Sequence, residues 1–170
     1  MNSEARRKII DKMLIKSENP IKGNSLADEL GVTRQVIVKD IAIMRAKGEK
    51  IIATPEGYIK SKDHKHYYRK VIAICHKPDD IEDELSIIVK FGGIIEDVIV
   101  EHALYGEIKG MLMIKTLYDV QNFIKKLKEY KAEPLMILTG GVHLHTIMAE
   151  SEEILEKIEQ ELKNKNYLVT

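Results

Sequence analysis

The stretch NSLADELGVTRQVIVKDIAIMRA, residues 24–46, decides the fold of the first third of the chain. Its beginning predicts a short helix through Leu30, and Gly31 then allows a sharp turn. Thr33 is suited to cap a second helix that runs to about Ala46. Two helices joined by a tight, glycine-containing turn form the helix-turn-helix pattern.

The second helix of this pattern has one buried and one exposed face. Ile37, Ile41 and Met44 recur at helical spacing and predict the buried stripe. In a helix-turn-helix the first residues of the second helix reach base edges in the major groove of DNA. The residues expected to contact DNA are therefore Thr33, Arg34, Gln35, Lys39 and Arg45.

These residues differ in what they recognise. Arg34 suits the acceptor atoms of guanine, and Gln35 suits adenine. Lys39 and Arg45 are better placed to contact phosphates. A helical hairpin with solvated charges is the alternative interpretation.

A predicted hairpin follows the second helix directly. Two short strand-like runs, Ile51–Ala53 and Tyr58–Ile59, flank Pro-Glu-Gly, which is a turn sequence. A hairpin in this place is the wing of a winged helix. We predict a winged helix-turn-helix domain over residues 1–62 and a linker over 63–67.

The rest of the chain, residues 68–170, alternates strand-like and helix-like patterns in the order βαββαβα. Such an order predicts helices packed on one face of an antiparallel sheet. The expected fold class is therefore α+β, with an N-terminal winged helix-turn-helix followed by this second domain. The single cysteine, Cys75, is expected to lie in its core.

Charge is unevenly spread along a chain with 27 basic and 27 acidic residues. The first 66 residues hold 14 Lys and Arg against 9 Asp and Glu, and the remainder holds 13 against 18. A basic segment with a DNA-binding pattern favours a nucleic-acid partner. No apolar run reaches the roughly 18 residues of a membrane span, and the charged N-terminus lacks a signal sequence. The expected location is cytoplasmic, with no membrane partner.

Two histidines lie in the apolar stretch GGVHLHTIMAE, residues 140–150. Residues two apart on a strand point to the same face, so His143 and His145 should lie side by side. A single histidine in such a place is more often an ordinary core residue. A neighbouring pair on an inner face indicates a bound ligand, and a metal ion above all.

Two further residues extend this candidate site. His76 follows the first strand of the second domain, and Glu84 shares a helix face with an apolar stripe. A carboxylate beside a buried stripe is costly unless it is paired or bound to metal. We therefore expect His76, Glu84, His143 and His145 to bind a divalent ion such as zinc or nickel. A tetrahedral zinc would then be closed, whereas a larger coordination sphere leaves room for a further ligand.

The sequence also resembles a known family. Residues 24–59 resemble the winged helix of the biotin-repressor type. The segments HKPDD, GGIIEDVIVEHALYGEI and PLMILTGGVHLHTI are similar to the three-histidine domain of the niacin-responsive transcriptional repressors (NiaR-like). The two likenesses together cover nearly the whole chain.

This resemblance implies a cytoplasmic repressor of genes for niacin uptake and NAD biosynthesis, and not an enzyme. It implies nicotinic acid as co-repressor, a bound divalent transition metal (nickel or zinc), and a homodimer that reads palindromic operator DNA. The family's metal ligands fall on the same four residues. We expect His102 and Tyr105 to contact the effector, and nicotinate to complete the coordination of the metal.

Two other functions remain open at this point. A histidine–glutamate metal site could belong to a zinc hydrolase, with Glu107 or Glu101 as the base. Four protein ligands would close a tetrahedral zinc, however, and no nucleophile–base pair is evident. Alternatively, the metal itself could be the signal, which would make the protein a metal-responsive transcriptional regulator.

Overall fold

A computed structural model describes residues 2–60 and 67–169. Residues 63–66 of the expected linker lie outside the described residues. The chain divides into two compact units, residues 1–65 and 66–170, and each is described by itself. Within the described ranges, no helix has the length and apolar character that crossing a membrane requires.

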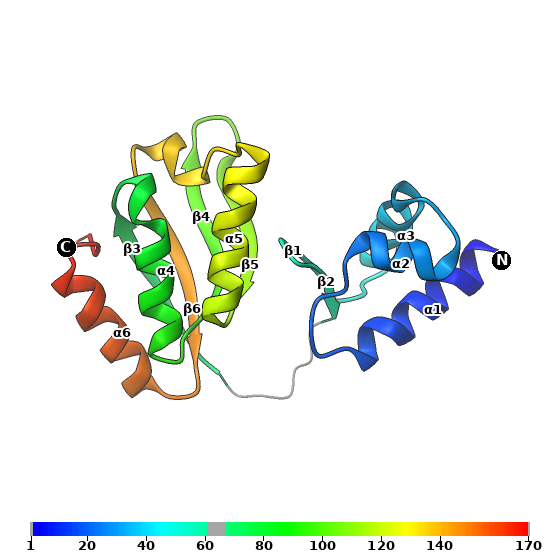
Figure 1. Ribbon diagram of the computed structural model, residues 1–170, viewed down its shortest axis with the longest axis horizontal. Coiled ribbons are helices and arrows are strands. Elements are labelled where there is room, and N and C mark those ends of the chain that lie inside the picture. Colours follow the sequence, from blue (N-terminus) through cyan, green and yellow to red (C-terminus); the bar gives the residue numbers. More distant parts are fainter. Residues whose placement is uncertain (1, 61–66, 170) are drawn as a thin grey trace. The chain divides into compact units, whose positions relative to one another are not determined.

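The first unit contains three helices and a two-stranded antiparallel hairpin (Figure 1). Its elements are α1 (Ser3–Lys16), α2 (Gly23–Leu30), α3 (Arg34–Ala46), β1 (Ile51–Thr54) and β2 (Gly57–Lys60). The turn between α2 and α3 starts at Gly31, whose φ of 63° is readily adopted by glycine. The predicted winged helix-turn-helix is confirmed.

Apolar side chains from all three helices form the core of this unit. The fully buried members include Leu14 of α1, Leu26 of α2 and Ile37 of α3. Asp40, also buried, connects α3 to α1. Its carboxylate lies 2.6 Å from Arg6 Nε and 3.1 Å from Arg7 Nη1.

The second unit is an antiparallel four-stranded sheet with helices, in the predicted order βαββαβα. Its elements are β3 (Tyr68–Cys75), α4 (Ile81–Lys90), β4 (Ile94–His102), β5 (Gly106–Ile114), α5 (Leu117–Tyr130), β6 (Val142–Ala149) and α6 (Glu152–Asn164). Two 3₁₀ helices join them, η1 (Pro78–Asp80) and η2 (Leu135–Thr139). The predicted α+β class is confirmed.

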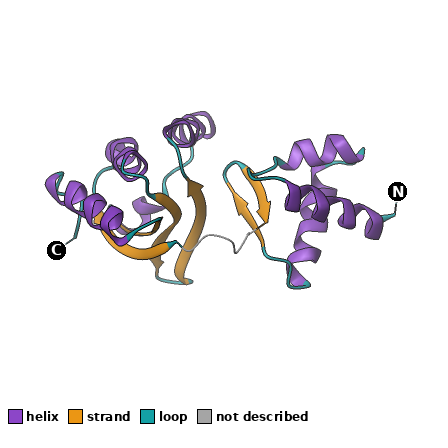
Figure 2. Ribbon diagram, turned by 90° about the horizontal axis from the view of Figure 1, so that it is seen from below, coloured by secondary structure: helices purple, strands orange, loops and turns teal. Residues whose placement is uncertain are grey.

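The strands lie in the order β3-β6-β4-β5, so the last strand is inserted between the first and the second. Helices α4, α5 and α6 cover one face of this sheet (Figure 1). Figure 2 shows the same arrangement from below, with the helices on one side of the strands. The core lies between the two layers and includes Ile74, Ile88, Ile147 and Ile158.

Pairing between β3 and β6 determines which side chains face the helices. Ile72 lies opposite His145, and Ile74 lies opposite His143. Directly paired residues share a face of a sheet, so both histidines point into the buried layer.

The expectation that Cys75 lies in the core is wrong. Cys75 is exposed, and it lies opposite Val142, which is 45% exposed. Strand residues alternate between faces. Because Ile74 faces the helices, Cys75 faces the side that they do not cover.

Candidate metal centre

The four residues proposed as metal ligands lie together under helix α4. His143 and His145 come from β6, His76 follows the end of β3, and Glu84 lies in the first turn of α4. Glu84 is 1% exposed, and both histidines of β6 are 3% exposed. Ligand-type atoms of His76, Glu84 and His143 all lie within 4.8 Å of one another.

All three imidazoles turn the same nitrogen, Nε2, toward the carboxylate of Glu84. Nε2 of His76 lies 2.9 Å from Glu84 Oε2, and Nε2 of His143 lies 3.7 Å from the same oxygen. Nε2 of His145 lies 3.1 Å from Glu84 Oε1. The ring of His143 meets the rings of His76 and His145 edge to face, with centroids 5.0 and 4.9 Å away.

The other nitrogen of each ring, Nδ1, is held by a backbone carbonyl. It lies 2.7 Å from Lys77 O in His76, 2.9 Å from Gly141 O in His143 and 2.5 Å from Asp97 O in His145. A carbonyl only accepts, so Nδ1 donates its proton in each ring. In a neutral imidazole this leaves Nε2 with a free lone pair, which is the arrangement found in metal-binding histidines.

Charge in the site is balanced between the rings and the carboxylate. Burial lowers the pKa of His76, but hydrogen bonds to Glu84 and to the Lys77 carbonyl outweigh this effect and raise it. Burial likewise lowers the pKa of His145, and the charge of Glu84 raises it overall. Burial raises the pKa of Glu84, yet the charge of His145 and hydrogen bonds from the histidines hold it well below its ordinary value.

The residues present fit a divalent transition metal. Three neutral imidazoles would direct lone pairs at one carboxylate, and this repulsion is relieved either by protons on Nε2 or by a metal ion between the groups. Glu84 Oε1 is buried, and its 3.1 Å contact with Nε2 of His145 lacks the geometry of a full hydrogen bond, so no hydrogen-bond partner satisfies this oxygen among the described residues. A buried, unsatisfied carboxylate oxygen is costly. Imidazole nitrogen and carboxylate oxygen are ligands of zinc and nickel.

Gly141 is a site residue that sequence reasoning missed. A Cβ at this position would lie 2.5 Å from the carbonyl oxygen of His76, and the φ of Gly141 is 102°. Only glycine therefore lets the start of β6 pass so close to His76. The signal in the sequence was the Gly-Gly pair directly before Val142.

Tyr167 is the second missed residue. Its ring centroid lies 5.1 Å from that of His76, and its hydroxyl donates to Asp83 Oδ2 over 3.0 Å. Burial and the hydrogen bond to Asp83 raise the pKa of Tyr167 to about 12. The segment after α6 returns to β3, where Cys75 N donates to Tyr167 O. Tyr167 thereby packs its ring against that of His76.

The two residues predicted to contact an effector are not part of this cluster. His102 ends β4, and its Nδ1 accepts hydrogen bonds from the backbone N–H groups of Leu104 and Tyr105, over 3.1 and 3.3 Å. Tyr105 is 71% exposed. Both residues thus belong to the β4–β5 turn, and their contact with an effector stays a prediction.

The catalytic alternative finds no support in this geometry. Glu101 and Glu107 lie opposite each other on β4 and β5, and both are exposed. Neither belongs to the group of ligand-type side chains found in the described part of the chain.

The residues predicted to contact DNA lie at the surface of the first unit. All five are exposed: Thr33, Arg34, Gln35, Lys39 and Arg45. Thr33 immediately precedes α3, as predicted, although its side chain makes no capping hydrogen bond. Their exposure agrees with a role in DNA contact, and the contact itself stays a prediction.

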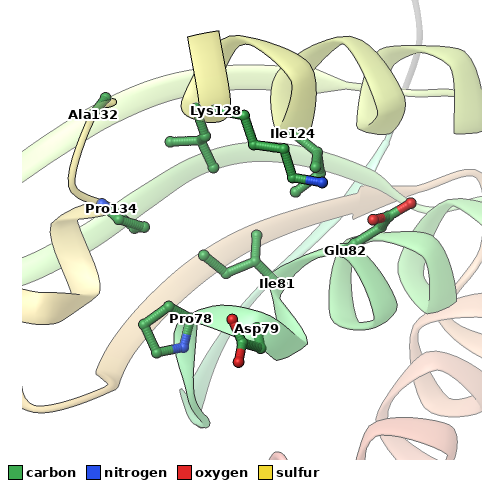
Figure 3. Close-up of a pocket in the computed structure, with 9 residues that line it drawn as sticks. Pro78, Asp79, Ile81, Glu82, Ile124, Lys128, Ala132 and Pro134 are labelled. Carbon is green, nitrogen blue, oxygen red and sulfur yellow. The ribbon is translucent and has the colours of Figure 1, made fainter. Parts of the chain in front are cut away.

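A pocket of about 310 Å³ lies between the start of α4 and the end of α5 (Figure 3). Its lining consists of Pro78, Asp79, Ile81, Glu82, Ile124, Leu127, Lys128, Ala132 and Pro134. Apolar side chains mixed with a few charged groups are common in small-molecule sites. The pocket adjoins the metal-ligand cluster in sequence, since Pro78 follows His76 by two residues and Ile81 precedes Glu84 by three.

Comparisons with known proteins match both units. Residues 6–59 match the HTH domain, and residues 69–170 match the 3H domain. A protein from Thermotoga maritima named "Probable transcription repressor NiaR" is 45% identical over 166 residues, which cover 98% of this chain and 94% of that protein. The "Transcription repressor NadR" of Bacillus subtilis is 38% identical over 160 residues, or 92% of this chain and 88% of that protein.

A helix-turn-helix unit joined to a unit with a buried polar cluster defines a transcription regulator rather than an enzyme, and the matched repressors agree. More specifically, the chain belongs to the NiaR-like family of transcription repressors, which the 3H-domain match and the full-length relatives establish.

The close approach at Gly141 yields a first prediction. We expect Gly141→Ala to lower the affinity for zinc at least about tenfold, because the new Cβ displaces the backbone of His76, whose side chain is a proposed ligand. Gly140→Ala is the control, since its φ of 63° is also positive but its Cβ would meet no atom within 4 Å. Competition with a chromophoric chelator measures both affinities. Equal affinities for the two variants would contradict the prediction.

The raised histidine pKa values yield a second prediction. Protons compete with the metal for Nε2, so zinc affinity should rise steeply between about pH 6 and pH 8, with release of protons. Without metal, a raised pKa stabilises the folded state below the unfolded histidine pKa of about 6.5, and this stabilisation is lost as pH rises.

Two measurements test this pH dependence. Calorimetry in two buffers of different ionisation enthalpy counts the released protons, and thermal melts follow the metal-free protein across the same pH range. A zinc affinity that does not change with pH, or a metal-free protein that becomes more stable toward pH 8, would contradict the prediction.

Proposed function

We propose that this protein is a repressor of niacin uptake and NAD biosynthesis genes that binds operator DNA in response to nicotinic acid. The metal-ligand cluster of the second unit forms its regulatory site. The observation that carries the proposal is the convergence of three imidazole Nε2 atoms on one buried carboxylate, in a chain that also contains a winged helix.

A nickel or zinc ion would be held by His76, Glu84, His143 and His145. When bound, such an ion supplies a positive charge and further coordination positions for a small anionic ligand. The backbone carbonyls of Lys77, Gly141 and Asp97 keep the rings oriented for this role. Preorganised rings lower the cost of assembling the site.

The assignment of nicotinic acid rests on the family resemblance of the 3H unit. Its carboxylate and ring nitrogen are both suitable metal ligands. The pocket between α4 and α5 has one ammonium group in its lining, that of Lys128, together with the carboxylates of Asp79 and Glu82. Binding of nicotinate favours the DNA-competent arrangement of the protein only if nicotinate binds this arrangement more tightly than the other arrangements.

DNA recognition is assigned to α3 in a homodimer. Two copies of the winged helix would reach major-groove faces about 34–36 Å apart, or a multiple of that distance, on a palindromic operator in the cytoplasm. Arg34 and Gln35, at the start of α3, are directed at base edges, while Lys39 and Arg45 contact phosphates.

Calorimetric titration of the full chain tests the effector assignment. We expect nicotinic acid to bind the metal-loaded protein and to bind at least about tenfold more weakly after chelator treatment, because the metal forms part of its site. Nicotinamide, which lacks the carboxylate, should bind poorly. If operator binding follows the metal and ignores nicotinic acid, the protein is a metal-responsive regulator.

A variant pair makes the same experiment specific to the cluster. Glu84→Gln should lower zinc and nickel affinity by about 100-fold or more, because it removes the buried charge that the ion neutralises. It should also abolish metal-dependent binding of nicotinic acid. Glu156→Gln, an exposed residue of α6, is the control and should bind both like the unaltered protein.

The proposed division of roles on α3 gives a further prediction. Arg34→Ala should cost about 1–3 kcal/mol in DNA binding and relax the preference for the operator sequence. Arg45→Ala should instead weaken binding to all DNA sequences alike, and the slope of log affinity against log salt concentration should fall by about 1. Selection from random DNA and salt titrations measure these effects. Lys8→Ala on α1 is the control, and an unchanged preference in Arg34→Ala would contradict the assignment.

A further inference from the structure

Asp97 is a buried carboxylate outside the set of four proposed ligands. It lies in β4 and is 2% exposed. A buried charged group is costly unless its oxygens are paired or hydrogen-bonded. The partners of Asp97 therefore indicate its role in the structure.

The strand around Asp97 is irregular. Ile95 lies opposite Ile147 and Ile99 lies opposite Leu144, so β4 has one residue more than β6 between these two pairs. Such a bulge interrupts the regular ladder and turns backbone groups of the bulged strand in new directions.

The side-chain carboxylate and the backbone carbonyl of Asp97 both accept hydrogen bonds at this bulge. Its side-chain Oδ1 accepts a hydrogen bond from the backbone N–H of Thr146 over 3.0 Å, and Oδ2 lies 3.2 Å from Lys109 Nζ. Its backbone carbonyl accepts from Nδ1 of His145 over 2.5 Å. The carboxylate thus satisfies an N–H of β6, while the carbonyl is directed at the imidazole.

We infer that Asp97 is a positioning residue for the metal site. Its carboxylate stabilises the bulge, and the bulge holds the Asp97 carbonyl where it fixes the orientation and tautomer of His145. This inference rests on the proposed function for the metal itself, but the effect on the ring of His145 is present without metal.

Two substitutions at Asp97 distinguish the effect of where its side-chain oxygens lie from the effect of their charge. Asp97→Asn keeps an oxygen at the same distance from the backbone and loses the charge, and Lys109, whose side chain is 46% exposed, can turn to solvent. Asp97→Glu keeps the charge and moves the oxygens outward by one methylene. We expect Asp97→Asn to bind zinc within about threefold of the unaltered protein and Asp97→Glu to bind about 10–100-fold more weakly.

The first measurement is zinc affinity by chelator competition, with thermal melts of the metal-free proteins. Glu101→Gln, an exposed carboxylate on the same strand, is the matched control and should bind within about threefold. The second measurement is the ¹⁵N NMR spectrum of histidine-labelled, metal-free protein at alkaline pH. There Asp97→Asn should keep the Nδ1-protonated form of His145, and Asp97→Glu should shift it toward a mixture of tautomers.

The inference is overturned if Asp97→Asn loses zinc affinity as strongly as Asp97→Glu. The charge of the Asp97 side chain, and not the position of its oxygens, would then determine zinc affinity. The inference is also overturned if Asp97→Glu changes stability but leaves both zinc affinity and the His145 tautomer unchanged. If the unaltered protein binds neither zinc nor nickel, the proposed function fails, and the tautomer of His145 still tests the role of Asp97.

Discussion

The carboxylate of Glu84 is buried among three imidazoles, and the packing of the whole second unit has to accommodate this one group. A buried carboxylate needs positive charge or hydrogen bonds on every side. Here those partners come from the end of β3 and from β6, which requires these two strands to be neighbours. The insertion of the last strand between β3 and β4 and the position of α4 above them meet this requirement together.

The orientation of the rings depends on backbone groups rather than on other side chains. Each Nδ1 donates to a carbonyl, and the three carbonyls belong to three separate segments of the chain. Such carbonyls move only when the path of the main chain moves. The geometry of the cluster is therefore coupled to the features that shape that path, namely the glycine at position 141 and the bulge in β4.

Much of the fold could be predicted because its signals are local. The helix-turn-helix follows from apolar spacing and Gly31, and the four-residue cluster follows from a histidine pair on one strand face and Glu84 beside an apolar stripe. Features set by contacts between distant segments could not be predicted. Periodicity places Cys75 on a strand, but it does not say which face the helices cover. Tyr167 likewise lies 91 positions after His76, with no local pattern to connect them.

The segment that contains Tyr167 also forms hydrogen bonds with the edge of the sheet. β3 is an outer strand, and outer strands expose backbone groups that can pair with another chain. After α6 the chain returns along β3, where Val169 N donates to Ala73 O and Cys75 N donates to Tyr167 O. This stretch of the edge is therefore already hydrogen-bonded within the molecule. It is protected from the strand addition that leads to aggregation, at the point where the sheet lies next to His76.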